Sequence, residues 1–189
     1  MDTSRHMLSH TELRLTKPNR GDFRKLPRRP ITVLLDGLRQ NHNIGAIFRL
    51  CDAFLVQRLV IAGHPIDLRN RKLVKAARGT QRWVPWTSSD DAFEVVKAAK
   101  TFGLFIIAAE QTAVSLGPAS MTVQYPVLLV LGGETFGVSP QILDWADTII
   151  ALPMLGMANS LNVSTAAAIL LYEIGRGERW PTTSATRPA

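Results

Sequence analysis

A short polar stretch near the C-terminus, residues 159–162 (NSLN), has residue types that could bind a ligand or cap a helix. It follows residues 149–152, an apolar run of strand length that ends at Pro153. It precedes residues 166–171, whose small and aliphatic side chains predict a buried helix. Polar groups between two buried elements must be paired, because burying them without a partner costs free energy. The stretch alone leaves both roles open, helix capping and ligand binding.

Two further segments carry polar side chains suited to catalysis. Asn43 and Arg49 belong to residues 41–54, whose apolar residues recur at helical spacing, and Asn43 is expected to cap that helix. From its position, Arg49 can face either a cleft or plain solvent. Glu134 belongs to residues 132–137 (GGETFG), which directly follow an apolar run. Glycine there permits either a close backbone approach to a ligand or a tight turn.

Several familiar chemistries lack their sequence signatures. The chain contains no G-x-G-x-x-G after its first strand, no G-x-x-x-x-G-K-[ST], no G-x-S-x-G and no H-E-x-x-H. Its four histidines have no metal-ligand spacing, and its one cysteine, Cys51, fits a reducing compartment. These patterns argue against a dinucleotide dehydrogenase, a P-loop nucleotidase and a zinc hydrolase.

The net charge of +7 is unevenly distributed along the chain. Residues 1–30 carry eight cations against three acids, and residues 67–86 carry six cations against one acid, whereas residues 101–175 contain no lysine or arginine. This division predicts a polyanion-binding surface beside a pocket for a different ligand. The alternative for the first block is a solvated basic tail. Trp83 and Trp86 end the second block, and we interpret them as core residues rather than stacking platforms.

Strand-like apolar runs alternate with helical segments. The predicted strands are residues 31–35, 58–62, 104–109, 126–131 and 149–152, and helices are expected in residues 43–54, 90–101 and 139–145 and at the C-terminal end. Continuous apolar strands predict a mostly parallel sheet with helices on both faces. Ligands of such folds bind at the carboxyl ends of the strands, where the loops at Glu110, residues 132–137 and residues 152–160 lie. A chain of 189 residues without an apparent signal peptide or membrane span is expected to be one cytoplasmic domain.

Three segments together resemble the motifs of the SpoU, or TrmH-like, family of RNA ribose 2′-O-methyltransferases, which lies in the SPOUT superfamily. They are Asn43-x-x-Ala46-Ile47-x-Arg49, Leu131-Gly132-x-Glu134-x-x-Gly137, and Leu152-Pro153-Met154-x-Gly156-x-x-x-Ser160-Leu161-Asn162-Val163-Ser164. The stretches RGTQRW at residues 78–83 and AEQT at residues 109–112 are lesser matches. Leu55 departs from the family pattern, which usually has glycine there, and this affects only a turn.

The resemblance implies more than the residue patterns do. It implies an α/β domain at residues 29–177 whose C-terminal segment forms a deep trefoil knot, with a basic extension at residues 1–28 and a tail at residues 178–189. It also implies a homodimer with the active site at the subunit interface, and S-adenosyl-L-methionine as cofactor. The implied cofactor-binding residues are Ala109, Gly132, Leu152, Met154 and Leu161. The implied catalytic residues are Arg49, Asn43, Glu134, Ser160 and Asn162.

The chemistry of methyl transfer agrees with these residue types. A sulfonium donor needs no metal, but a ribose hydroxyl is a poor nucleophile and needs help to lose its proton. A guanidinium with a pKa above about 12 is a very poor base. We therefore expect Arg49 to hold the target phosphate and lower the pKa of the hydroxyl, while Asn43 and Glu134 orient Arg49 or the ribose. Ser160 and Asn162 can cap the helix and still present a side-chain atom.

The resulting expectation is an RNA methyltransferase that acts on tRNA, with RNA contacts from the basic blocks. The expected RNA-binding residues are Arg28, Arg29, Arg71, Lys72, Arg78 and Arg82. One alternative is a 23S ribosomal RNA methyltransferase, and another is a non-catalytic RNA-binding member of the fold. The intact catalytic set argues against the non-catalytic alternative. Neither DNA nor a membrane is an expected partner.

Overall fold

The computed structural model describes residue 7, residues 9–15 and residues 17–176 of the chain. The described part of the chain divides into two units, one up to Pro27 and one that begins at Arg28. In the described part, no helix has the length and apolar character needed to cross a membrane.

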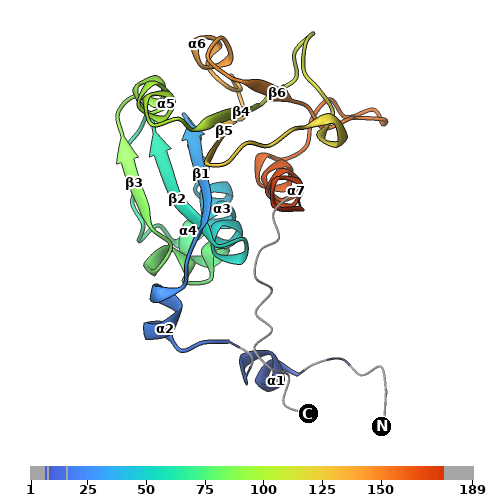
Figure 1. The fold of residues 1–189 in the computed structure, drawn as a ribbon. Helices are drawn as coiled ribbons and strands as arrows, with labels where there is room; N and C mark the ends of the chain where they lie inside the picture. Colours follow the sequence, from blue (N-terminus) through green and yellow to red (C-terminus); the bar gives the residue numbers. More distant parts are fainter. Residues whose placement is uncertain (1–6, 8, 16, 177–189) are drawn as a thin grey trace. The chain divides into compact units, whose positions relative to one another are not determined.

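The second unit is built on one six-stranded sheet in the order β3-β2-β1-β5-β4-β6, and all five strand pairings are parallel (Figure 1). The strands are β1 (Arg29–Asp36), β2 (Val56–Ala62), β3 (Trp86–Ser89), β4 (Phe105–Ala109), β5 (Val127–Gly132) and β6 (Thr148–Ile150). The helices of this unit are α3 (Asn41–Ala53), α4 (Arg71–Ala77), α5 (Ala92–Thr101), α6 (Pro140–Leu143) and α7 (Val163–Arg176), with the short helices η1 (Thr80–Arg82) and η2 (Pro118–Ser120). The predicted parallel α/β architecture is confirmed.

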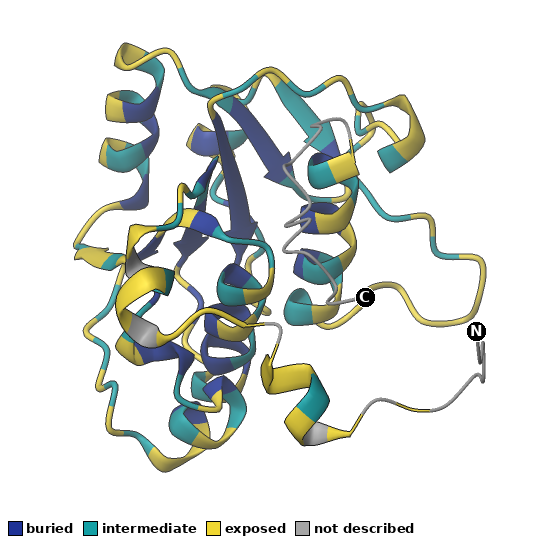
Figure 2. Cartoon of the chain, turned by 60° about the horizontal axis from the view of Figure 1, so that its bottom comes forward, coloured by how far each residue is buried: buried dark blue, intermediate teal, exposed yellow. Residues whose placement is uncertain are grey.

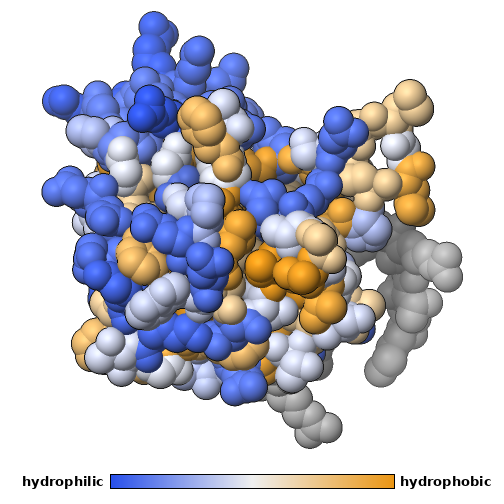
Figure 3. All heavy atoms as spheres, turned by 90° about the horizontal axis from the view of Figure 1, so that it is seen from above, coloured by the Kyte–Doolittle hydropathy of each residue, from blue (hydrophilic) through white to orange (hydrophobic). Residues whose placement is uncertain are grey.

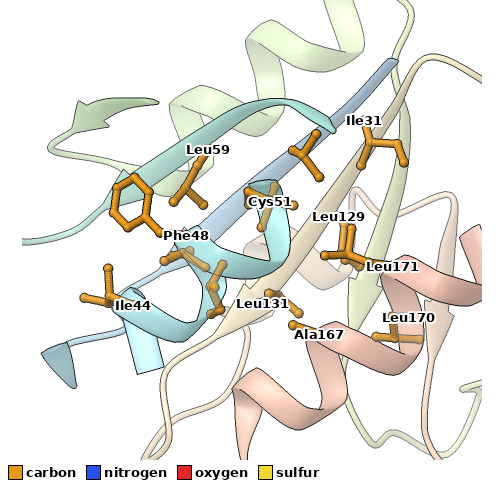
Figure 4. Close-up of a cluster of buried hydrophobic side chains, with 14 of the residues drawn as sticks. Ile31, Ile44, Phe48, Cys51, Leu59, Leu129, Leu131, Ala167, Leu170 and Leu171 are labelled. Atoms are coloured by element: carbon orange, nitrogen blue, oxygen red, sulfur yellow. The ribbon is translucent and has the colours of Figure 1, made fainter. Parts of the chain in front are cut away.

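Helices cover both faces of the sheet because successive strand residues point to opposite sides. On β1, Ile31, Val33 and Leu35 join a cluster with residues of α3, α4 and α7, whereas Leu34 joins a second cluster with residues of α5 and α6. Figure 4 shows the first cluster, in which side chains of α3 and α7 meet those of β1, β2 and β5. The central strands are buried, and the helices keep an exposed outer side (Figure 2).

The tryptophans after the second basic block are core residues, as expected from the sequence. The ring of Trp86 packs edge-on against Phe48 with centroids 6.2 Å apart. Trp83 donates from Nε1 to Asp52 Oδ1 at 2.7 Å. Both side chains therefore join the strand edge to α3.

The prediction of a wholly buried C-terminal helix is wrong for the single chain. One face of α7 is buried through Ala167, Leu170, Leu171 and Ile174. The opposite face leaves 38% of Ile169 and 59% of Tyr172 exposed. Composition could not distinguish these faces, because both are apolar.

The N-terminal extension contains two short helices, α1 (His10–Leu15) and α2 (Arg20–Lys25). Ser9 and Glu12 form a reciprocal capping box at the start of α1, with Ser9 N donating to Glu12 Oε2 at 2.7 Å. Asn19 caps α2 by accepting from the amides of Gly21 and Asp22. The basic residues of this segment thus belong in part to capped helices.

Candidate functional site

The candidate site lies at the carboxyl ends of β1 and β5, where the strand order reverses. From β1 the chain moves outward to β2 and β3, whereas β5, β4 and β6 lie on the other side of β1. Asp36 and Gly132 are paired at the last position of the two central strands. The loops that follow them flank the crevice in which open parallel sheets bind ligands.

The glycine-rich loop after β5 forms a tight turn. Gly137 donates its amide to Gly133 O at 2.9 Å and has a φ of +66°, which favours glycine. A Cβ on Gly132 would overlap the backbone of Gly137, so this loop folds directly onto the strand end. The sequence left two roles open for these glycines, a close backbone approach to a ligand and a tight turn. The observed contacts support the turn.

Glu110, which follows β4, holds the glycine-rich loop in place. Its Oε2 accepts from the amide of Val138 at 2.8 Å, and its Oε1 accepts from the amide of Gln111 at 2.9 Å. The side chain of Gln111 continues the connection by donating to Asn159 O at 2.7 Å. The three loops that leave β4, β5 and β6 are therefore fixed to one another.

Asn43 connects the three sequence motifs through its side-chain amide. Its Nδ2 donates to Glu134 Oε1 at 2.5 Å, and its Oδ1 accepts from Asn162 Nδ2 at 3.1 Å. Only 1% of Asn43 is exposed, whereas Glu134 and Asn162 are exposed residues, so both bonds are partly buried. Residues separated by 91 and 119 positions in the chain thus form one polar network.

The expectation that Asn43 caps its helix is wrong. Helix α3 begins at Asn41 with Gln40 in the capping position, and Gln40 makes no side-chain cap bond. Asn43 lies inside the first turn, where its Nδ2 also donates to Gln40 Oε1 at 3.0 Å. Its side chain points to the polar network, which a capping geometry would have prevented.

Asn162 has both roles that the sequence left open. Its Oδ1 accepts from the amide of Ser164 at 2.9 Å and from the Ser164 hydroxyl at 2.7 Å, which caps α7. Its Nδ2 remains available for the bond to Asn43. Ser160 lies two residues earlier on the exposed loop.

Arg49 lies on the exposed side of α3 and lines a groove of about 1210 Å³ between α3, α4 and α7. Three further cations from α4 and its C-terminal turn, Lys72, Lys75 and Arg78, line the same groove. Ser164 and Thr165 line it from α7, next to the Asn162 cap. Among the described residues, Arg49 makes no hydrogen bond to Asn43 or Glu134, so the network and Arg49 are separate features of one region.

The residues expected to bind a cofactor follow three neighbouring strands. Ala109 pairs with Leu131 of β5 and with Ile150 of β6, which places Ala109, Gly132 and the segment from Leu152 along one edge. Leu152 and Met154 are half-buried, and 41% of Leu161 is exposed. Figure 3 looks down on the end of the molecule where β1, β2 and β3 end, and hydrophobic surface gathers on one side of this view.

Two expected RNA-binding residues have structural roles. Arg29 is only 7% exposed and donates from Nη2 to Gly175 O at 2.8 Å, so its assignment to RNA binding is wrong. Arg28 is half-buried and donates to the carbonyls of Val56 and Trp83. Burial lowers the pKa of the Arg28 guanidinium, and nearby Asp52 opposes this shift. Both arginines look like surface charges in the sequence because they follow a basic segment.

The other four expected RNA-binding residues, Arg71, Lys72, Arg78 and Arg82, are exposed on α4 and the turn after it. Sequence reasoning missed Lys75, which lines the groove beside Lys72 because the two lie three positions apart on one helix. It also missed His42 as a groove residue, although His42 and Arg49 are seven positions apart and so share a helix face. Helical spacing was the signal for both.

The histidines, acidic residues and cysteine that the structure describes do not gather into a metal centre. In the described part of the chain, no three His, Cys, Asp or Glu side chains are grouped so that they could hold a metal ion. Cys51 is fully buried in the core, and burial raises the pKa of its thiol. The thiol therefore stays protonated and packs as a small apolar side chain.

Comparisons with known proteins agree with this geometry. Residues 30–172 match the SpoU rRNA Methylase family. A tRNA (guanosine(18)-2′-O)-methyltransferase from Aquifex aeolicus is 34% identical over 150 residues, which are 79% of this chain and 70% of the relative. The solved A. aeolicus TrmH/SpoU tRNA modifying enzyme aligns with a TM-score of 0.74 and 33% identity, over 82% of this chain and 80% of that one. AviRb, a SpoU methyltransferase from Streptomyces viridochromogenes solved with AdoMet, aligns with a TM-score of 0.69 and 30% identity, over 82% of this chain and 60% of that one.

Proposed function

The chain belongs to the SpoU rRNA Methylase family, and from this premise we propose that it methylates a ribose 2′-hydroxyl of tRNA. The observation that carries this proposal is the buried Asn43 side chain, which joins Glu134 and Asn162 at the strand-order reversal. Relatives at about a third identity are named for 2′-O-methylation of a tRNA guanosine, which supports tRNA as the substrate. The family's own name supports ribosomal RNA as the second candidate substrate.

The cofactor in this proposal is S-adenosyl-L-methionine, which supplies an electrophilic methyl group on a sulfonium. The residues present fit such a ligand, because the adjacent strand ends provide backbone polar groups at Ala109 and Gly132. Apolar side chains of Leu152, Met154 and Leu161 lie in the segment after β6 and are only partly buried, so they can pack against an adenosyl group. Residues 101–175 contain no lysine or arginine, which suits a cofactor that brings its own positive sulfonium. AviRb, a neighbour in structure, was solved with AdoMet.

Arg49 has the position expected of a phosphate-holding residue. It is exposed in the groove beside Lys72, Lys75 and Arg78, so a phosphodiester chain can follow these cations to Arg49. Its planar guanidinium can bind a phosphate with two parallel hydrogen bonds. Held in this way, the 2′-hydroxyl lies next to a fixed positive charge, which stabilises the alkoxide that develops as the proton leaves.

The other catalytic residues position the reacting groups. Asn43 is fixed by three partners, Gln40, Glu134 and Asn162, and its bond to the Glu134 carboxylate keeps that side chain at the crevice. Glu134 and Ser160 are both exposed, so their side chains are accessible to the ribose of the substrate. Asn162 ties this region to the first turn of α7 through its cap.

The exposed apolar face of α7 supports a homodimer. Ile169 and Tyr172 on this helix are 38% and 59% exposed, and Leu161 in the loop before the helix is 41% exposed. A second copy would bury this stripe and place the active site at the subunit interface. The trefoil knot of the C-terminal segment, the cytoplasmic location and the division into residues 1–28, 29–177 and 178–189 are parts of the same proposal and come from the family resemblance.

The test is incubation of the purified protein with radiolabelled S-adenosylmethionine and either unmodified tRNA or ribosomal RNA, followed by nucleoside analysis. Label in a 2′-O-methylated nucleoside from the tRNA pool is the expected result. If label appears only in the ribosomal RNA pool, the substrate is ribosomal RNA, with 23S RNA as the expected molecule, and tRNA is wrong. Cofactor binding is measured in parallel by calorimetry. A protein that binds no cofactor and transfers no label to RNA would be a non-catalytic RNA-binding member of the fold.

A further inference from the structure

A second hollow lies beside α4 and adjoins the groove that contains Arg49. It encloses about 600 Å³ and is lined by Leu68 and Arg69 from the loop after β2, Val74 from α4, and Gln81 and Arg82 from η1. Its walls combine apolar side chains with two guanidinium groups. None of these residues belongs to the polar network around Asn43.

Gln81 is the unusual member of this hollow. The residue is only 7% exposed, and its Oε1 is buried with no hydrogen-bond partner among the described residues. An acceptor left in this state lowers the stability of the folded protein, because it has lost its hydrogen bonds to water without gaining others. A buried glutamine that costs stability and lines a hollow is a sign of a ligand that completes its hydrogen bonding.

The turn that carries Gln81 is held rigidly in an unfavourable backbone conformation. Arg78 and Gly79 have φ values of 54° and 95°, and φ in this region strains a residue with a side chain such as Arg78. Thr80 fixes the turn by donating its hydroxyl to Ala77 O at 2.7 Å. The sequence therefore maintains a defined orientation of η1 at some cost in stability.

The charges around the hollow favour an anionic ligand. Arg82 is exposed at the rim, and Arg69 is 93% exposed at its side chain while its Nε lies 3.2 Å from Asp67 Oδ1. The Asp67 carboxylate thus offsets part of the Arg69 charge, which leaves Arg82 as the main phosphate-binding group. Leu68 and Val74 provide an apolar wall of the kind that packs against the face of a base or ribose.

The hollow adjoins the groove that contains Arg49. Val74 lines both, with Lys72 and Lys75 on the groove side and Gln81 and Arg82 on the other. We propose that this hollow binds one unpaired nucleotide of the RNA substrate, at a distance from the methylated ribose. The Gln81 amide turns toward the bound base, so that its Oε1, which is buried in the free protein, accepts an N–H of the base, and the phosphate binds Arg82. The inference rests on the proposed function, since it takes RNA as the substrate.

Gln81→Met tests this subsite, because methionine keeps the length of the side chain and removes the acceptor. RNA affinity is measured by fluorescence anisotropy on an unmodified tRNA transcript over a range of salt concentrations, and thermal unfolding is measured in parallel. We expect the dissociation constant to rise about five- to tenfold with the salt slope unchanged, since the lost bond is uncharged. We expect thermal stability to stay equal or increase, because an unpaired buried acceptor has been removed.

Arg82→Gln is the companion variant, and it should lower the salt slope by about one. Gln141→Met, at an exposed glutamine of α6, is the matched control and should change neither quantity. Lower stability of Gln81→Met with unchanged RNA affinity would show that Gln81 has only a structural role and would overturn the subsite. If the unaltered protein methylates RNA while Gln81→Met binds RNA normally, the proposed subsite is wrong and the proposed function stands. If the unaltered protein binds no RNA, the subsite and the proposed function fail together.

Discussion

The part of the chain before Thr101 and the part after it contribute strands to the same sheet, but they expose different kinds of side chain to solvent. Before it lie all but three of the 22 lysines and arginines, and residues 101–175 contain none. Among the described residues, residues 28–100 expose no large hydrophobic side chain to a comparable degree, whereas Phe136, Leu155 and Met157 in the later half are each more than nine-tenths exposed. The earlier half is suited to bind a polyanion, and the later half is suited to apolar and backbone contacts.

The halves meet through a few polar side chains. Asn43 comes from the basic half, and its two long-range partners, Glu134 and Asn162, come from the cation-free half. Arg49 and Ser164 line one groove from opposite halves. A reaction between a polyanionic substrate and an adenosyl cofactor needs such a boundary, because each half alone can hold only one of the two reactants.

Arg49 should show the largest effect, since it is the basic half's contribution to the reaction. Arg49→Ala should lower turnover about 100- to 1000-fold, the range found when a single group that stabilises a developing oxyanion is removed. Arg49→Lys should remain at least about tenfold slower, because lysine keeps the charge and loses the planar fork. Turnover is measured with tRNA and labelled cofactor at saturation.

Two controls separate this effect from misfolding. The unfolding temperature of both Arg49 variants should match that of the unaltered protein, because Arg49 is exposed. Arg58→Ala removes an exposed arginine of β2 outside the groove and should keep normal turnover. Near-normal activity of Arg49→Lys would contradict the proposed role of the guanidinium in holding the phosphate.

Substitution of Asn162 can remove the contact between the two halves of the chain and still keep the helix cap. Asn162→Asp keeps an oxygen that accepts from Ser164 N, and a negative charge at a helix N-terminus is favourable, so stability should be unchanged. The bond from Nδ2 to Asn43 is lost, and turnover should fall about tenfold. Asn162→Ala loses both bonds and should also lower the free energy of unfolding by about 1 kcal/mol. Equal turnover in Asn162→Asp and the unaltered protein would mean that Asn162 is only a cap.

The sequence predicted the sheet well because its central strands are continuous apolar runs. The family resemblance grouped Asn43, Glu134 and Asn162, since each belongs to one of its three motifs, and the structure joins them by hydrogen bonds. The sequence pattern placed Asn43 wrongly as a helix cap, because the bond that orients this side chain comes from Glu134, 91 positions away. Local preference carries no information about such a partner.

Charge was harder to interpret than apolarity. Arg29 and Arg71 look alike in the sequence, yet Arg29 is buried against Gly175 O and Arg71 is exposed on α4. The burial of Arg29 depends on the C-terminal helix lying beside β1, which no short-range pattern predicts. Gln81 was likewise missed as a candidate, because an unpaired acceptor is visible only once its surroundings are known.

The lysines of α4 test whether the basic half binds the substrate's backbone. Lys72→Gln together with Lys75→Gln should weaken tRNA binding about fivefold at moderate salt and lower the salt slope by about two, because two phosphate contacts are lost. Turnover at saturating tRNA should change much less than in the Arg49 variants. The matched control is Lys97→Gln, on α5 and paired with Glu94, which should leave the slope unaltered. If the salt slope of the double variant equals that of the unaltered protein, α4 does not belong to the RNA-binding surface.

The N-terminal extension should show the smallest effect. Arg28 and Arg29 belong to the folded unit through their bonds to Val56 and Gly175, so the truncation must end at Pro27. Deleting residues 1–27 removes six cations and should lower the salt slope, while affinity falls only about two- to threefold because exposed charges are strongly screened. Anisotropy titrations of the truncated and full-length proteins measure both. An unchanged slope would mean that the extension's charges do not contact RNA and that α4 and its neighbours carry the polyanion binding alone.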